Sequence, residues 1–90
     1  MAGIVGIKFR LMPSSPDINL EEIKTKAKIL LEEKNAMKIE ITEEPVAFGL
    51  KSVNLFFQYD EEKETSEIEE ALGNIENVQS CEITDLRKLA

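Results

Sequence analysis

The stretch VGIKFRLMPSSPDINLEEI, residues 5–23, holds the two local patterns that decide the fold. In its first half an apolar residue stands at every second position: Val5, Ile7, Phe9 and Leu11. A period of two predicts a strand with one buried face. Pro13 and the loop residues PSSPD end this strand, because proline cannot donate a hydrogen bond to a ladder.

The second half of the stretch predicts a helix over residues 20–34. Asn19 and Glu22 have the spacing of an N-cap and a reciprocating acid, a variant of the capping box. Four apolar residues then fall on one helical face: Ile23, Ala27, Leu30 and Leu31. Glutamates in the first turn and Lys34 at the end complement the helix dipole.

Two further strands follow, and both are predicted by alternation. The second contains Met37, Ile39 and Ile41, and the segment EEPVAFG, residues 43–49, interrupts it with irregular backbone. The third alternates over residues 52–59, with four apolar residues on one face: Val53, Leu55, Phe57 and Tyr59. The charged segment DEEKE forms the turn after it.

The chain ends with a short helix and a last strand. Ser66 and Glu69 have a second capping-box spacing, and apolar residues recur at helical intervals after them: Ile68, Leu72 and Ile75. Gly73 weakens this helix. Residues 78–88 then predict a strand with Cys81 and Ile83 on one face.

The predicted order is therefore β-α-β-β-α-β, in a single domain over residues 1–90. Two right-handed crossovers of this kind give an α+β, ferredoxin-like sandwich with both helices on one face of a four-stranded antiparallel sheet. In that fold the strand order is 4-1-3-2. The EEPVAFG loop and the carboxyl end of the last strand then lie at opposite ends, roughly 30 Å apart for strands that rise ~3.3 Å per residue.

Composition limits the partners. With 18 acidic and 11 basic residues the net charge is −7, which argues against nucleic acid and against an anionic membrane surface. An acidic domain can instead be steered to a basic protein partner. No apolar run approaches membrane-spanning length and the start lacks a signal-peptide pattern, so we expect a cytoplasmic protein.

Covalent chemistry has few candidate residues. The chain has no histidine and a single cysteine, Cys81, which excludes a Ser-His-Asp or Cys-His site and a Cys-x-x-Cys metal site. The carboxylates fall in surface runs, where none has the burial that a catalytic dyad requires. We therefore expect no enzyme activity, no metal, no cofactor and no stable small-molecule ligand.

Three positions leave alternatives open. Phe48 is either the first core residue of the third strand or an exposed aromatic anchor at a loop tip. Lys88, judged from its spacing alone, is a solvated terminal lysine. GIVGIKFR, residues 3–10, is similar to the phosphate-binding segment of acylphosphatases. In that family the arginine lies in a loop, whereas Arg10 continues the strand alternation. The spacing between the two glycines of GIVGIKFR is also one residue short. For the function of the whole domain, an acylphosphatase-like hydrolase and a passive ferredoxin-like regulatory module are therefore the two alternatives.

Three segments together resemble the elongation factor 1-beta family, and its archaeal members most closely: IKFRLMPSSPDINLEEI, EEPVAFGLKSVNLFF and ENVQSCEITDLRKL. Their order and spacing cover nearly the whole chain. The resemblance implies a guanine-nucleotide exchange factor of translation, which binds elongation factor 1-alpha in its GDP form and speeds GDP release. The same ferredoxin-like fold is implied.

The resemblance also nominates site residues. Lys88 and Leu89 match a carboxyl-terminal lysine and aliphatic residue that act at the magnesium site of the GTPase, although Ala90 follows them here. Phe48 matches the aromatic that docks on the second domain of the GTPase. Gly49, Lys51 and Arg87, which flank these residues, are the other expected partner-binding positions.

Overall fold

The computed structural model of the chain describes residues 3–89. Its elements occur in the predicted β-α-β-β-α-β order, with a single 3₁₀ turn, η1 (Ala47–Gly49), between the second and third strands. The strands are β1 (Ile4–Pro13), β2 (Met37–Pro45), β3 (Lys51–Asp60) and β4 (Val78–Lys88), and the helices are α1 (Leu20–Glu33) and α2 (Ser66–Gly73).

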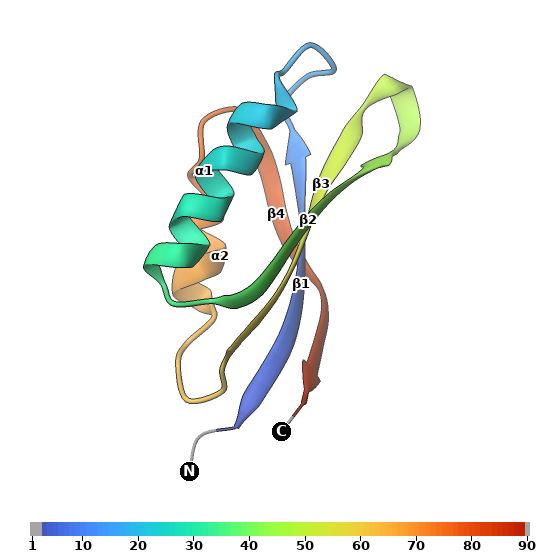
Figure 1. Ribbon diagram of the computed structural model, residues 1–90. Coiled ribbons are helices and arrows are strands. Elements are labelled where there is room, and N and C mark those ends of the chain that lie inside the picture. Colours follow the sequence, from blue (N-terminus) through green and yellow to red (C-terminus); the bar gives the residue numbers. More distant parts are fainter. Residues whose placement is uncertain (1–2, 90) are drawn as a thin grey trace.

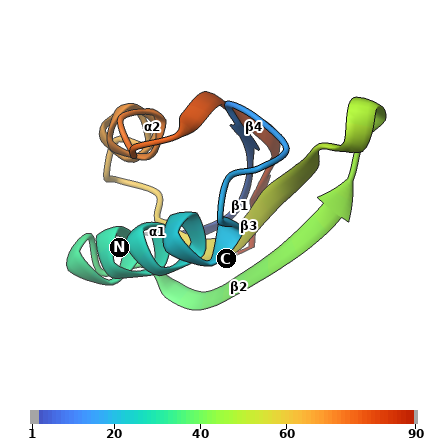
Figure 2. The same cartoon turned by 90° about the horizontal axis from the view of Figure 1, so that it is seen from above.

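The four strands form one sheet in the order β2-β3-β1-β4, and all neighbouring strands are antiparallel. This is the predicted 4-1-3-2 order read from the other edge. Figure 1 and Figure 2 show both helices on the same side of the sheet. The structure therefore confirms the ferredoxin-like sandwich.

The core lies between the helices and one face of the sheet, here called the helix face. It is built from the residues that the alternation predicted in β1 and β3, together with the apolar stripes of the helices: Val5, Ile7, Phe9, Leu11, Ile23, Ala27, Leu31, Val53, Leu55, Phe57, Tyr59, Ile68 and Leu72. At its centre the rings of Phe9 and Phe57 stack, with centroids 5.9 Å apart. Period-two burial and this stacking fix the register of the two central strands.

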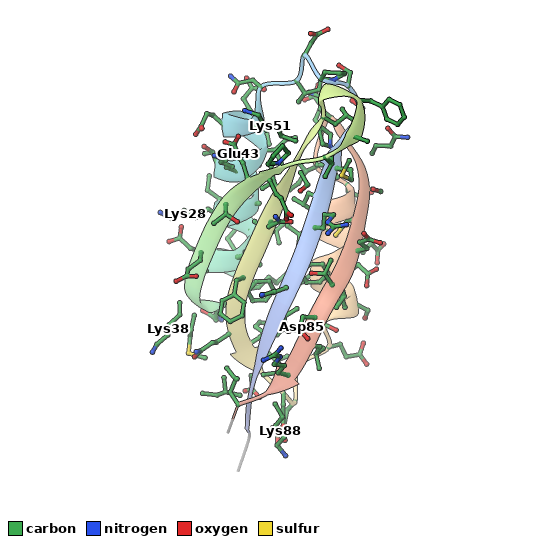
Figure 3. The ribbon with its side chains drawn as sticks, turned by 90° about the vertical axis from the view of Figure 1, so that its right-hand side faces the viewer. Lys28, Lys38, Glu43, Lys51, Asp85 and Lys88 are labelled. Atoms are coloured by element: carbon green, nitrogen blue, oxygen red, sulfur yellow. The ribbon has the colours of Figure 1, made fainter. Side chains whose placement is uncertain are left out.

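The opposite face carries no helix, and we call it the open face (Figure 3). Lys8 and Arg10 of β1 lie on it opposite Phe56 and Asn54 of β3. A shallow depression of about 760 Å³ runs over these side chains. Of its charged groups, Arg10 pairs with Glu82 of β4, whose carboxylate oxygen lies 3.6 Å away.

The edge strand β2 departs from the prediction at both ends. Its register shifts between Met37 and Glu40, and Lys38 there has a φ of +51°. Met37 consequently lies opposite Gln58 on the open face, 41% exposed, and does not share a face with Ile39 and Ile41 as the alternation implied. The strand also continues to Pro45, which an edge strand tolerates.

Of the local predictions near the carboxyl end, the capping box of α2 was wrong and the facing of β4 was confirmed. The N-cap of α2 is Thr65 and makes no side-chain cap hydrogen bond, so Ser66 is the first helical residue and not a capping-box serine. Ile83 shares the helix face with Cys81, as the alternation predicted, and is 37% exposed on the edge strand β4. Asn19, by contrast, is confirmed as the N-cap of α1, where its side chain accepts from the Glu21 N–H.

A β-bulge at Thr84 determines on which face of the sheet the later residues of β4 lie. Lys8 lies opposite Asp85 and Phe9 opposite Ile83, so Thr84 is the extra residue. Its hydroxyl donates to the Lys8 carbonyl at 3.4 Å. After the bulge, Asp85 and Arg87 lie on the open face, whereas Lys88 lies opposite Val5 on the helix face.

Candidate functional site

The residues nominated from sequence fall into two groups at opposite ends of an elongated molecule. Its principal dimensions are 45 × 22 × 19 Å, and the strands run along the long axis. Figure 1 places the β2–β3 hairpin at one end and the carboxyl end of β4 at the other. Phe48, Gly49 and Lys51 belong to the hairpin end, and Arg87, Lys88 and Leu89 to the other, which we call the tail end.

The hairpin tip is a tight loop in which two consecutive residues have left-handed backbone. The Val46 N–H donates to the Leu50 carbonyl at 2.8 Å, and the Leu50 N–H donates to the Ala47 carbonyl at 3.3 Å. Between them Phe48 has φ +63° and Gly49 has φ +75°. Glycine adopts this conformation without steric cost, but phenylalanine does not.

Phe48 is 93% exposed at this tip. The alternative that it begins the core of β3 is therefore wrong, and Leu50 is the partly buried residue next to it. Phe48 destabilises the folded state in two ways. Its apolar ring is left in water, and its left-handed backbone is strained by ~1–2 kcal/mol. Their coincidence at a loop tip is typical of a residue kept for contact with another molecule.

Lys51 begins β3 directly beneath the tip, opposite Pro45, and is exposed (Figure 3). Its charge lies near Glu43 of β2. A hydrogen bond from Lys24 of α1 is the main cause that lowers the pKa of Glu43, and the charge of Lys51 adds to it. The hairpin end therefore carries a cation three residues from the exposed ring, and the nearby acid Glu43 is already bound by Lys24 of α1.

At the tail end, pairing to β1 continues beyond the last residue of β4. The Leu89 N–H donates to the Ile4 carbonyl at 2.7 Å. Lys88 and Leu89 are thus held in extended backbone at the rim of the sheet, with Lys88 at the foot of the view in Figure 3. Ala90, which follows them, lies outside the described residues.

The cations of the tail each meet one carboxylate. The ammonium of Lys88 lies 3.5 Å from Glu61 of the β3–α2 loop, and Arg87 Nε lies 2.9 Å from Asp85. Glu61 is itself fixed, because its backbone N–H donates to the Gly3 carbonyl at 3.0 Å. The Lys88 side chain is 68% exposed, so this ion pair is one that solvent screens.

Lys88 and Leu89 point to opposite faces of the sheet. Lys88 extends on the helix face toward Glu61, whereas Leu89 lies across the open face against Gly6. Sequence reasoning missed both Glu61 and Gly6. No pattern pairs Glu61 with Lys88 across the fold, and strand alternation does not distinguish Gly6 from the other residues on its face.

The structure offers little to the hydrolytic alternative. Arg10 lies in the middle of β1 beside Glu82, not in a loop that could wrap a phosphate. Burial is the main cause that raises the pKa of the Cys81 thiol to about 12, so it is a poor nucleophile at neutral pH. Neither α1 nor α2 is long and apolar enough to cross a membrane.

Comparison with known proteins decides between the remaining classes. The model of the EF-1 guanine nucleotide exchange domain matches residues 6–89. The chain belongs to this exchange-domain family. The match extends from Gly6 to Leu89 and therefore includes all six residues nominated from sequence.

Curated relatives of the exchange-domain family agree over nearly the whole chain, and each is named "Elongation factor 1-beta". That of Methanobrevibacter smithii is 42% identical over 89 residues, which cover 97% of this chain and 98% of the relative. That of Methanothermobacter thermautotrophicus is 39% identical over 88 residues, 97% and 98% of the two chains. That of Methanococcus maripaludis strain S2 is 37% identical over 87 residues, 96% and 97% of the two chains.

These matches give the function of the chain: it is a translation elongation factor that promotes guanine-nucleotide exchange. Its partner is an elongation factor GTPase. The acylphosphatase-like and passive regulatory alternatives are not favoured.

Proposed function

We propose that the partner is elongation factor 1-alpha in its GDP-bound form, and that the two ends of the molecule perform different parts of the exchange. The observation that carries the proposal is the tail: an exposed ammonium, Lys88, at the rim of a rigid sheet in a member of an exchange-domain family. The hairpin end, where Phe48 is exposed, supplies a second contact, and it lies at the opposite end of the molecule's 45 Å long axis.

Lys88 acts on the magnesium site of the GTPase. Tight GDP binding depends on Mg²⁺, which neutralises the phosphate charge. An ammonium pushed toward the ion repels it and takes over part of its role as a counter-charge while the site rearranges. Unit charges ~4 Å apart interact by roughly 4 kcal/mol at an effective dielectric near 20. Because about 1.4 kcal/mol is already tenfold, one lysine suffices to change the release rate by orders of magnitude.

Phe48 supplies affinity. An exposed ring at a loop tip fits an apolar pocket on the second domain of the GTPase, and burial of such a ring often dominates the energy of an interface. Gly49 permits the turn that presents the ring, and Lys51 adds a positive charge beside it. Arg87, on the tail, contributes a partner contact next to Lys88. Leu89 completes the exchange-promoting tail.

The exchange factor carries out no covalent chemistry. By linkage, GDP weakens the binding of this protein to the GTPase by the same factor by which this protein weakens the binding of GDP. GTP then enters and drives dissociation. No cofactor, metal, nucleic acid or small ligand of its own takes part in this scheme, and the reaction belongs in the cytoplasm, where translation occurs.

The test is the release of a fluorescent GDP analogue from purified elongation factor 1-alpha, with and without this protein, at millimolar Mg²⁺. Release should accelerate in proportion to the exchange factor at low concentrations. Removal of Mg²⁺ by EDTA is the positive control, because it opens the site without the protein. Unchanged release with the protein present, together with cleavage of an acyl phosphate, would show that the hydrolytic alternative is right.

A further inference from the structure

The glycine at position 6 is not required by the backbone. Gly49 is the only glycine with positive φ among the described residues, so Gly6 has a conformation that any residue adopts in a strand. Glycine in a strand costs stability, because it is ordered at a high entropic cost and has no side chain to pack. Gly6 is nevertheless buried, near the start of β1 and opposite Arg87 of β4. Something else occupies the space that its side chain would take.

That occupant is the side chain of Leu89. A Cβ placed on Gly6 would lie 3.1 Å from Leu89 Cδ1, with the other branch atoms of the same side chain 3.5 and 3.6 Å away. A contact of 3.1 Å is tighter than nearly all contacts of a real Cβ, so an added methyl group would displace Leu89 by a few tenths of an ångström. Leu89 is 49% exposed and near the chain end, so it can yield without disturbing the core.

We propose that Gly6 is a positioning residue for exchange: its missing side chain forms the seat in which Leu89 lies, and this seat fixes the place of Lys88. The proposal rests on the proposed role of Lys88. Strand alternation links the two residues, because Leu89 is held to the open face while Lys88, its neighbour, is directed to the other. The Leu89 N–H bond to Ile4 is the second attachment of the same residue.

The physical consequence is one of precision. A lysine on a frayed end samples many positions, and a misplacement of ~1 Å at a reacting centre can cost roughly 10²-fold in rate. A tail seated on Gly6 presents its ammonium in a narrow range instead. Leu89 is therefore the anchor of the tail, and Lys88 is the group that reaches the GTPase.

A graded series at position 6 tests this. Gly6→Ala should lower the exchange rate by about threefold, and Gly6→Val by about tenfold or more, close to the loss in Lys88→Ala. Affinity for the GTPase and melting temperature should change little, because alanine and valine suit a strand at least as well as glycine. Gly73→Ala is the matched control: its Cβ would meet only Cys81 Cβ at an ordinary 3.8 Å, so exchange should be unaffected.

A double variant identifies the contact through which Gly6 acts. Gly6→Ala combined with Leu89→Ala should exchange no more slowly than Leu89→Ala alone, because the added methyl group then meets no leucine. Fully additive losses would contradict the seat. In the wild-type protein, NMR should show contact between the Leu89 methyl groups and the Gly6 α-protons, together with slow hydrogen exchange of the Leu89 amide. Gly6→Val should lose both signals.

The outcomes separate this inference from the proposed function. Normal exchange by Gly6→Val, with Lys88→Ala impaired, would overturn the role of Gly6 and leave that of Lys88 in place. Loss of the Leu89–Gly6 contact when the wild-type protein binds the GTPase would also overturn it, because Leu89 would then leave its seat for the partner. If the wild-type protein fails to release GDP, the proposed function fails, and the NMR contact still reports on the seat.

Discussion

Each end of this molecule contains a glycine, and the two glycines differ in what they provide: one a backbone conformation, the other space. At the hairpin end, Gly49 is needed for its backbone: φ is +75°, and a Cβ there would meet nothing within 4 Å. At the tail end, the backbone of Gly6 is ordinary, and a Cβ there would press on Leu89 at 3.1 Å, so we infer that glycine serves for its space. At one end an aromatic ring projects into water, and at the other the Leu89 side chain packs against the sheet.

This difference matches a division of labour. An exposed ring contributes binding energy wherever a pocket accepts it, and tolerates some freedom of approach. A charge that must meet a metal site requires a defined position, because electrostatic energy changes steeply at short distance. The hairpin end is accordingly a simple projection, whereas the tail end is held by a backbone hydrogen bond and a packed leucine.

The largest expected effect is at the hairpin end. Phe48→Ala should weaken complex formation by about 2 kcal/mol, the order expected when a dominant interface aromatic is truncated. Titration calorimetry with the GDP-bound GTPase measures this loss. Melting temperature should hardly change, because the ring is 93% exposed. Unchanged affinity would remove the hairpin end from the interface.

Lys88→Ala should separate exchange from binding. The variant should still form the complex, but GDP release should slow by about tenfold or more, which corresponds to ~1.4 kcal/mol. Stability should be nearly unaffected, because the side chain is exposed and near the chain end. Lys88→Ser is a useful second variant of the same kind. Normal release by Lys88→Ala at millimolar Mg²⁺ would reduce the residue to a solvated lysine.

The same position tests the metal mechanism. Lys88→Arg should restore exchange only in part, because a guanidinium is broader and less point-like than an ammonium. Lower free Mg²⁺ should narrow the gap between the wild type and Lys88→Ala, since the ion to be displaced is then scarce. A gap that is the same at every Mg²⁺ concentration would mean that Lys88 acts elsewhere on the GTPase.

A smaller effect is expected from the strained backbone of the hairpin. Phe48→Gly should raise the free energy of unfolding by up to ~1 kcal/mol relative to Phe48→Ala, because glycine adopts φ +63° without steric cost. Denaturant unfolding of the two variants measures the difference. Both lack the ring, so both should bind the GTPase equally weakly. Equal stabilities would mean that the turn is not strained.

The smallest effect is expected from the ion pair of the tail. Glu61→Gln frees the Lys88 ammonium before docking, and should speed GDP release by no more than about fivefold, since exposed ion pairs are worth at most ~1 kcal/mol. Glu62→Gln, one residue along the same loop, is the matched control for the loss of one charge. A marked slowing by Glu61→Gln alone would instead make Glu61 part of the exchange contact.

The architecture was predictable because its central strands carry an unambiguous signal. In β1 and β3 every second residue is apolar, and every one of these residues is buried. A prediction was wrong where the ladder is irregular. The alternation of Met37 with Ile39 breaks at the register shift around Lys38.

The site was predictable only in part, for a related reason. Phe48 and Lys88 were nominated by resemblance, and their roles remain proposals, while the structure adds that Phe48 is exposed on a left-handed backbone. Gly6 and Glu61 could not be found from sequence. Each acts through a residue more than 25 positions away, and such contacts have no periodic signature.

The bulge at Thr84 determines which face of the sheet each later residue of β4 occupies. Without it, the pairing of Phe9 with Ile83 would continue uninterrupted, and each later residue of β4 would pair one position further toward the start of β1. Leu86 would then stand opposite Gly6, and Lys88 opposite Ile4 on the open face. Pairing Thr84 as an ordinary ladder residue would therefore move Lys88 to the other face with no change in sequence, whereas deleting Thr84 would remove the bulge and keep every later pair as it is.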